Sequence, residues 1–361
     1  MAESLEGLRH VLQWPTVLYP VAGAVVGMFA ALVPGINGSL ALTLLIPLTF
    51  KMGAFEAITL MAAVVGGGSF AGSIAAILLN VPGEAPNAAT ALDGYALSRQ
   101  GKAAMALAVS ATASAMGALF GILVLVLLLP VARQIVFAFS FPEFFLLAFL
   151  GLAVISVAAR GTLLKGFIAG GFGMLLSFVG FDPFTGELRY VFDRPYLYDG
   201  IRIVPVIIGL FGVAEALRLL LEKEERISAV EASRFEWAQL LEGILFVFRH
   251  FGLFLRSSVI GTVIGIIPGV GGSVASFVAY TSAVQTAKDP DRFGRGDPRG
   301  VLAPEAANDA KNGGAALPTL AFGIPGSSDW AIALGAMVLH GLQPGPLLLR
   351  EHADTIWGII W

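Results

Sequence analysis

The stretch GMFAALVPGINGS at residues 27–39 contains a pattern that returns as GTVIGIIPGVGGS at residues 261–273. Both stretches read Gly, six residues, Pro-Gly, two residues, Gly-Ser, and both lie inside apolar runs. Proline ends or kinks a helix because it lacks an N–H and its ring clashes with the preceding turn. The sequence therefore predicts two apolar helices that are interrupted in the same way.

A second feature supports a duplication. Each copy is followed by a run of small residues that ends in another Pro-Gly, at residues 66–83 after the first copy and at residues 313–326 after the second. We expect the first of these runs to break the membrane crossing between Glu56 and Asn80. Paired interruptions in corresponding positions of two halves are typical of secondary transporters that are built from inverted repeats.

The composition sets the class of protein. Hydrophobic residues make up 57% of the 361 residues and charged residues only 13%, and the mean hydropathy is +0.82. Apolar stretches at residues 103–130, 135–158, 163–179 and 203–221 have about the 20 residues that a helix needs to cross a bilayer. The sequence therefore predicts an all-α polytopic membrane protein with two inverted repeats and with broken or re-entrant helices at the Pro-Gly motifs.

Several function classes are disfavoured. The net charge of −3, without any Lys/Arg block, argues against nucleic acid as a partner. The absence of cysteine excludes disulfides and thiolate chemistry, and the four histidines do not have zinc-like spacing. Because no nucleophile elbow or phosphate-binding loop is present either, we expect no enzyme activity and no cofactor.

The chain divides into four parts in this interpretation. An interfacial segment at 1–16 precedes the first membrane repeat at 17–130, central helices follow at 131–236, and the second repeat occupies 237–361. The central part contains an outer loop at 181–202 and a Lys/Glu-rich inner linker at 222–236. The outer loop is equally compatible with a docking surface and with a solvated loop. The last apolar run has only eight residues, so we expect a C-terminally truncated chain.

The interruptions are where we expect the substrate. Irregular backbone at membrane depth persists only where protein shields it or where it lines a wet cavity. A helix that begins there offers unpaired N–H groups and a positive dipole end, which suit a carboxylate. The alternative is that the glycines only allow close helix packing. The predicted substrate-binding residues are Pro34, Gly35, Asn37, Gly38, Ser39, Asn80, Pro82, Gly83, Pro268, Gly269, Gly271, Gly272, Ser273, Pro325, Gly326 and Ser327.

Polar residues near these motifs are candidates for coupling transport to an ion, either Na⁺ or H⁺. Ionisable groups inside a membrane are costly and usually serve a pathway. The candidates are Glu84, Asp93, Glu305, Asn308, Asp309 and Asn312. For Glu84 and Asp93 a position in a water-facing loop is an equally good interpretation. We expect no metal site beyond a possible Na⁺ site.

Segments along this chain resemble the TctA family, the large membrane subunit of the tripartite tricarboxylate transporters. They are the Pro34-Gly35 region with ALTLLIPLTF at 41–50, GSIAAILLNVPG at 72–83, AATALDGY at 88–95, RQG at 99–101, GIIPGVGG at 265–272, APEAAN at 303–308, GIPG at 323–326 and HGLQPGP at 340–346. The resemblance covers nearly the whole chain. It departs from the family at Asp309 and Lys311, where relatives commonly carry a second Asn and small residues, and at the C-terminus, where relatives are longer.

The resemblance implies a permease of the bacterial inner membrane that imports citrate or a related carboxylate by symport. It also implies two partners, a small membrane subunit and a periplasmic solute-binding protein. Two alternatives stay open at this point: a membrane scaffold or assembly subunit without its own pathway, and an anion channel.

Overall fold

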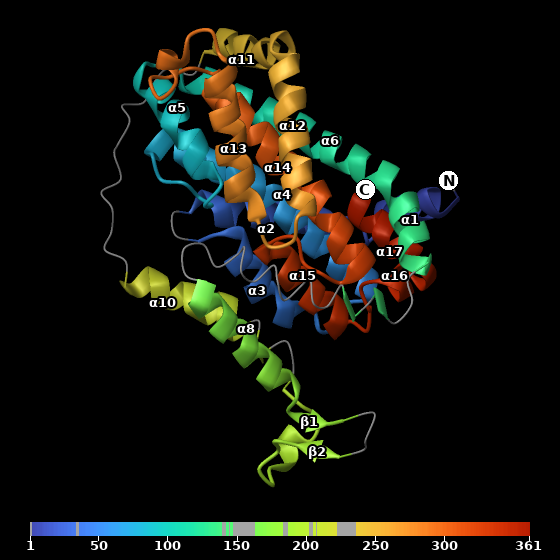
Figure 1. The fold of residues 1–361 in the computed structure, drawn as a ribbon. Coiled ribbons are helices and arrows are strands. Elements are labelled where there is room, and N and C mark those ends of the chain that lie inside the picture. Colours follow the sequence, from blue (N-terminus) through green and yellow to red (C-terminus); the bar gives the residue numbers. More distant parts are fainter. Residues whose placement is uncertain are drawn as a thin grey trace.

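The computed structural model describes residues 2–33, 36–138, 142–143, 145–146, 163–182, 187–201, 205–206, 208–221 and 236–361. The regular structure in these residues is almost entirely helical, as the composition predicted. Figure 1 shows a body of closely packed helices, from which helices and a small hairpin in the middle of the chain extend to one side.

The first half of the chain supplies six helices of this body. They are α1 (Ala2–Leu12), α2 (Leu18–Leu32), α3 (Gly38–Thr49), α4 (Ala54–Leu79), α5 (Asn87–Arg99) and α6 (Ala103–Ala138). The Asn37 side chain caps α3 by accepting a hydrogen bond of 2.8 Å from the backbone N–H of Leu40. Such a cap satisfies one of the N–H groups that the start of a helix leaves unpaired.

Glycines allow α2 and α4 to pack with their backbones in contact. A Cβ atom on Gly23 would lie 2.2 Å from the carbonyl oxygen of Leu60, and one on Gly27 would lie 2.3 Å from that of Val64. From the other side, a Cβ atom on Gly67 would lie 2.4 Å from the carbonyl oxygen of Ala24. The first glycine of the repeated pattern therefore serves helix packing, as the alternative interpretation of the glycines held.

The second half supplies the remaining helices. They are α11 (Trp237–Arg249), α12 (Phe251–Ile266), α13 (Gly271–Thr286), the 3-10 turn η3 (Pro290–Arg292), α14 (Arg299–Phe322), α15 (Ser328–Leu339), α16 (Pro346–Glu351) and α17 (Ala353–Ile360). Helix α14 is buried along most of its length and packs against α4, α5, α6, α12 and α13. Helix α14 also contacts the backbone of α12 through a glycine, as α4 contacts that of α2. A Cβ atom on Gly261 of α12 would lie 2.2 Å from the carbonyl oxygen of Ala307 in α14.

The expected break in the crossing between Glu56 and Asn80 is wrong. Helix α4 runs without interruption through residues 66–69, and α14 likewise runs through residues 313–314. A glycine costs a helix only about 1 kcal/mol relative to alanine. In α4 the cost is offset at Gly67, which lies against the backbone of α2, where no larger residue fits, and Gly68 lies beside the carboxyl group of Glu84. Helix α2 instead ends at Leu32 and α3 begins at Gly38, and further along the chain the helices are interrupted at residues 80–86, 267–270 and 323–327.

Two helices among the described residues are long and apolar enough to cross a membrane, α4 and α6. The pair α11 and α12, which bends by 73°, counts as a third if it forms one broken span. Helix α6 continues through Pro130, where the sequence predicted its end, because a proline in an apolar helix is tolerated when neighbouring groups satisfy the freed backbone. Most of the stretch predicted as a helix at 135–158 lies outside the described residues.

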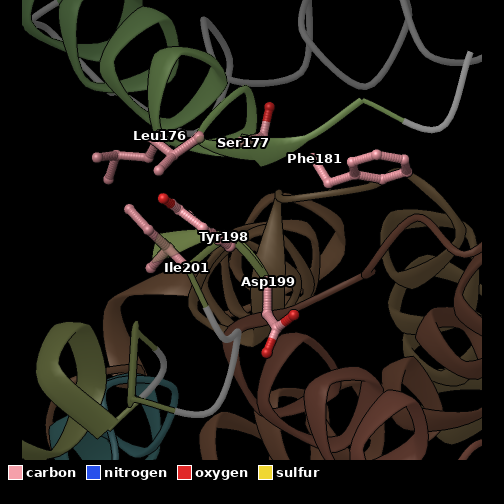
Figure 2. Close-up of a pocket in the computed structure, with 8 residues that line it drawn as sticks. Leu176, Ser177, Phe181, Tyr198, Asp199 and Ile201 are labelled. Carbon is pink, nitrogen blue, oxygen red and sulfur yellow. The ribbon is translucent and has the colours of Figure 1, made fainter. Parts of the chain in front are cut away.

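The central part of the chain forms the extension seen in Figure 1. It contains α8 (Leu163–Ser177), β1 (Gly180–Phe181), β2 (Leu188–Arg189), η1 (Pro195–Leu197), the π-helical η2 (Ile208–Val213) and α10 (Ala214–Leu221). The two strands pair antiparallel within the predicted outer loop, and Arg189 forms an ion pair with Asp182. A pocket of about 550 Å³ lies between the end of α8 and residues 198–201, where Leu176 faces Tyr198 and Ile201 (Figure 2). Residues 222–235 of the predicted inner linker lie outside the described residues.

Candidate functional site

The loop at residues 80–86 connects α4 to α5 and lies at the centre of the candidate site. Asn80 ends α4 in the left-handed conformation, with a φ of +58°, which Asn adopts more readily than most residues. The N–H of Gly83 donates to the carbonyl oxygen of Gly72 at 3.2 Å, and a Cβ atom on Gly83 would lie 2.2 Å from the carbonyl oxygen of Ala31. The loop therefore folds back against α4 and α2, and a glycine is required at this contact.

This fold brings Glu84 to the N-terminus of α3. The backbone N–H of Gly38 donates to Oε1 of Glu84 at 3.3 Å, and Gly38 and Gly68 leave room for the carboxyl group. A second carboxylate lies nearby, because Ser39 donates its hydroxyl hydrogen to Oδ1 of Asp329 at 2.5 Å. Asp329 stands in the first turn of α15, which Ser327 caps. The first interruption is thus faced by two acidic side chains of the protein itself.

The second interruption has different neighbours. Gly269 and Gly271 adopt positive φ values of +73° and +75°, which let the chain turn between α12 and α13. At the start of α13, a Cβ atom on Gly272 would lie 2.7 Å from Oδ1 of Asn308 and 2.9 Å from Cε of Lys311. It would also lie 2.9 Å from the ring of Pro86. The loop at 80–86 therefore lies between the N-termini of α3 and α13, with Glu84 towards the former and Pro86 beside the latter.

A buried carboxylate surrounded by hydroxyl groups lies beside this loop. Glu305 of α14 is completely buried and accepts hydrogen bonds from four side chains. Ser73 donates at 2.6 Å, Ser110 and Ser114 each donate at 2.9 Å, and Thr90 donates to the other carboxylate oxygen. Asn87 connects these hydroxyl groups to the loop at 80–86. Its amide nitrogen donates to Ser73, and its amide oxygen accepts from the N–H of Glu84. The hydroxyl donors are residues that the sequence analysis missed, although Ser110 and Ser114 stand four residues apart on an apolar helix.

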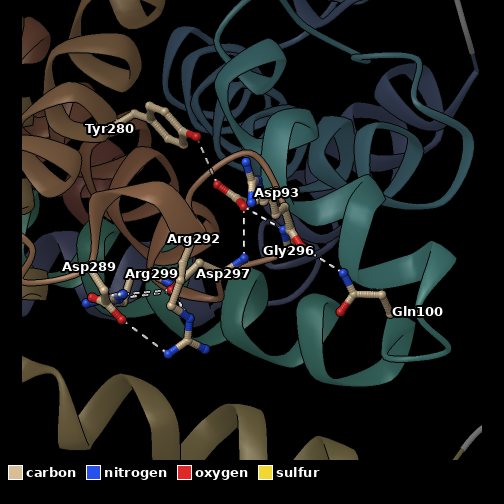
Figure 3. A network of polar contacts seen from close by, with 9 residues as sticks. Asp93, Gln100, Tyr280, Asp289, Arg292, Gly296, Asp297 and Arg299 are labelled. Atoms are coloured by element: carbon tan, nitrogen blue, oxygen red, sulfur yellow. Dashed lines mark hydrogen bonds and ion pairs between the residues drawn. The ribbon is translucent and has the colours of Figure 1, made fainter.

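Asp93 lies elsewhere. It is fully buried on α5, and its Oδ1 accepts two backbone hydrogen bonds of 2.8 Å from Gly296 and Asp297 in the loop between α13 and α14. Its Oδ2 accepts the hydroxyl hydrogen of Tyr280 at 2.9 Å. Figure 3 shows that these partners surround the carboxylate and tie α5 to the second half of the chain. Among the predicted coupling residues, Asp93 is therefore set apart from the cluster around Glu84 and Glu305.

The same loop contains an ion-pair network. The guanidinium group of Arg299 lies 2.7 Å from a carboxylate oxygen of Asp297 and 2.7 Å from one of Asp289 (Figure 3). Burial alone would raise the pKa of Asp297, but the hydrogen bonds and the charge of Arg299 outweigh it and hold that pKa below the ordinary 3.8. The hydrogen bond from Arg299 likewise lowers the pKa of Asp289. Both carboxylates are therefore ionised at neutral pH.

The remaining predicted residues divide between the site and its surroundings. Asn312 donates to the hydroxyl of Ser69 on α4 at 3.0 Å, and Asp309 is buried near Glu305 and Lys311. Gly326 is buried and donates its N–H to Thr319, whereas Ser273 lines a pocket along the exposed apolar face of α13. Pro82 and Pro325 are partly exposed, Asn80 is exposed, and Pro34 and Gly35 lie outside the described residues.

Comparison with known proteins identifies the family. Residues 17–361 match the tripartite tricarboxylate transporter TctA family. The chain is 34% identical over 355 residues to the "Uncharacterized 52.8 kDa protein in TAR-I ttuC' 3'region" of Agrobacterium vitis, a match that covers 98% of this chain and 70% of that protein. It is 38% identical over 100 residues to the "Uncharacterized protein in TAR-II ttuC' 3'region" of the same organism, which covers 28% of this chain and 41% of that protein. No solved structure matches the chain.

The matched family is a family of transporter components and not of enzymes, and the apolar helices agree with a membrane protein. The match extends from α2 to α17, and so includes every element of the candidate site. The chain belongs to the TctA family, the large subunit of the tripartite tricarboxylate transporters.

Proposed function

We propose that this protein is the permease subunit that carries a di- or tricarboxylate, or a related organic acid, across the bacterial inner membrane. Import is driven by a gradient of Na⁺ or H⁺. A small membrane subunit and a periplasmic solute-binding protein complete the transporter. The family membership supports the class of transporter, and the arrangement of the site supports the location of the pathway.

The observation that carries this proposal is the meeting of interrupted helices at one polar loop. The N-termini of α3 and α13 both contact residues 84–86, and the N-terminus of α15 contacts that of α3 through Ser39 and Asp329. The start of α13 has no side-chain cap, and unpaired N–H groups at such an end favour anionic groups of a substrate. Because irregular backbone of this kind is costly in hydrocarbon, its concentration at one place supports a binding function.

The two halves support an inverted repeat in this proposal. Helices α2 and α12 pack against the long helices α4 and α14 through the first glycine of the shared pattern, Gly27 and Gly261. Each is followed by an interruption and a shorter helix, α3 or α13. Alternating access then consists of a movement of these repeats around the loop at 80–86.

The buried carboxylates supply the coupling site. Glu305 accepts four hydroxyl hydrogen bonds, and among the described residues no basic side chain forms an ion pair with it. A buried carboxylate without such a partner is stabilised by binding a proton or a cation. Glu305 and the four hydroxyl groups around it therefore provide oxygen ligands for Na⁺ or an acceptor for H⁺, and Asp309 lies near Glu305.

Counterflow in proteoliposomes tests the proposal. The complete transporter is loaded with unlabelled citrate, and the uptake of labelled citrate is followed without an ion gradient. A carrier accumulates the label transiently, whereas a channel only equilibrates it and a scaffold subunit does neither. The absence of counterflow for citrate, succinate and malate with all subunits present would contradict the proposal.

A local test uses Gly269, whose positive φ forms the turn before α13. Gly269→Leu should abolish uptake of the carboxylate while the protein still inserts into the membrane. Gly252→Leu is the matched control, because a Cβ atom at Gly252 meets nothing within 4 Å. Full uptake by the Gly269 variant would place the pathway elsewhere.

A further inference from the structure

Lys311 is a buried lysine on the central helix of the bundle. Only 3% of its surface is exposed, and among the described residues its ammonium group forms no hydrogen bond or ion pair. The carboxylates of Glu84 and Asp309 lie within Coulombic range of its ammonium group without forming an ion pair with it. A buried ammonium group is costly unless it is paired and hydrogen-bonded. An anionic ligand that bound to Lys311 would therefore stabilise its buried ammonium group.

Asn308 lies one turn before Lys311 and is only 1% exposed. Neither its amide nitrogen nor its amide oxygen has a hydrogen-bond partner among the described residues. Buried polar side-chain atoms are nearly always hydrogen-bonded, so an unpartnered buried amide indicates a missing ligand. This observation is independent of the charge on Lys311.

Both side chains lie at the N-terminus of α13, a helix of 16 residues. Gly272 in its first turn is so close to them that a Cβ atom would meet Asn308 at 2.7 Å and Lys311 at 2.9 Å. The ammonium group, the amide and the positive end of the helix dipole therefore converge at one place. Charge-assisted hydrogen bonds from such donors to a carboxylate are about twice as strong as neutral ones.

The corresponding end of α3 is already occupied by the protein's own acid. Glu84 accepts from the N–H of Gly38, and Asp329 accepts from Ser39 in the first turn of α3. A carboxylate of the substrate would be repelled there, since like charges at close range disfavour each other. The two helix starts therefore differ in their neighbouring side chains: two carboxylates bond to the first turn of α3, whereas an ammonium-bearing side chain and an amide lie beside the first turn of α13.

From this difference we infer that a carboxylate of the substrate binds at the N-terminus of α13 to Lys311 and Asn308, and not at the N-terminus of α3. The inference rests on the proposed function as a carboxylate carrier and adds the residues that fix one end of the substrate. Asn308, predicted as an ion-coupling residue, is thereby assigned to the substrate.

Ligand binding to the complete transporter in nanodiscs tests the inference. The dissociation constants of citrate, succinate and malate are measured by calorimetry at fixed Na⁺ concentration, pH and ionic strength. Lys311→Gln should weaken binding about 30-fold, which corresponds to about 2 kcal/mol. Asn308→Ala should weaken it about 10-fold. Lys102→Gln, which removes an exposed lysine, is the matched control and should change nothing.

The outcomes separate this inference from the proposed function. Equal binding to the wild type and to both the Lys311 and Asn308 variants would overturn the inference and leave the carrier function standing. If none of the three acids binds to the wild type, both fail. If Lys311→Gln is not recovered folded, the Asn308 variant decides the question alone, because it changes no charge.

Discussion

Replacing Asp93 by Ala should loosen the loop between α13 and α14 in a measurable way. The carboxylate accepts two backbone hydrogen bonds, from Gly296 and Asp297, and one from the hydroxyl of Tyr280. A buried donor that loses its partner costs about 1–3 kcal/mol. The loss of both backbone hydrogen bonds should therefore lower the free energy of local opening by about 2–6 kcal/mol. Asp93→Asn should cost less, because its amide oxygen still accepts from the backbone.

Hydrogen–deuterium exchange at residues 287–298 measures this effect directly. A loss of 2 kcal/mol in the free energy of local opening corresponds to exchange that is about 30-fold faster. The control is Asp291→Asn, because Asp291 lies in the same loop with an exposed side chain. The reasoning is refuted if the amides of Gly296 and Asp297 exchange at the wild-type rate in Asp93→Ala, because the hydrogen bonds to Asp93 would then contribute nothing.

Three further changes test the packing, the loop charges and the buried carboxylate. Gly261→Leu should abolish folding of the purified protein in size-exclusion chromatography, because its Cβ would lie 2.2 Å from the carbonyl oxygen of Ala307, whereas Gly252→Ala should fold normally. Arg299→Gln should lower the Tm at pH 7, and the difference from the wild type should shrink as the pH falls below about 4. Because folding lowers the pKa of Asp289 and of Asp297, the two ionised carboxylates stabilise the fold at pH values above their ordinary pKa of 3.8. This stabilisation is lost as the pH falls through their lowered pKa values. Ser114→Ala should lower the free energy of unfolding by about 1.5–3 kcal/mol, because it removes a hydrogen bond to the Glu305 carboxylate. Ser177 is exposed, and Ser177→Ala should lower the free energy of unfolding by less than about 0.5 kcal/mol.

Backbone chemistry made part of the fold predictable. Proline and glycine have constraints that act locally, so Pro268 and Gly269 indicate the end of α12 without any knowledge of the neighbouring helices. The apolar stretch that became α6 was predictable for the same reason, because length and composition are local properties. The unbroken α4 was not predictable, since whether glycines interrupt a helix depends on what packs against them.

The acidic residues of the candidate site were conspicuous in the sequence, but their partners were not. Glu84 and Glu305 were conspicuous as acids in an apolar sequence, yet their partners come from residues 46 and 232 positions away, Gly38 and Ser73. Serine and threonine are common in membrane helices, where they bond to the backbone one turn earlier, as Thr59 does to the carbonyl oxygen of Phe55. Only the three-dimensional arrangement separates those hydroxyls from the four that converge on Glu305.

The repeated pattern also combines two physical roles that its sequence does not distinguish. Its first glycine lies in mid-helix, where Gly27 and Gly261 let two backbones touch. Its last glycine begins the next helix, where Gly38 lies beside Glu84 and Gly272 lies beside Lys311. The repeated pattern therefore places glycines at similar positions in both halves, whereas the side chains that approach from α14 and from the loop at 80–86 set the charge beside each following helix. We therefore expect substrate selection to depend on those approaching side chains, because Asn37 and Glu84 already accept from the first N–H groups of α3, whereas the start of α13 has no side-chain cap.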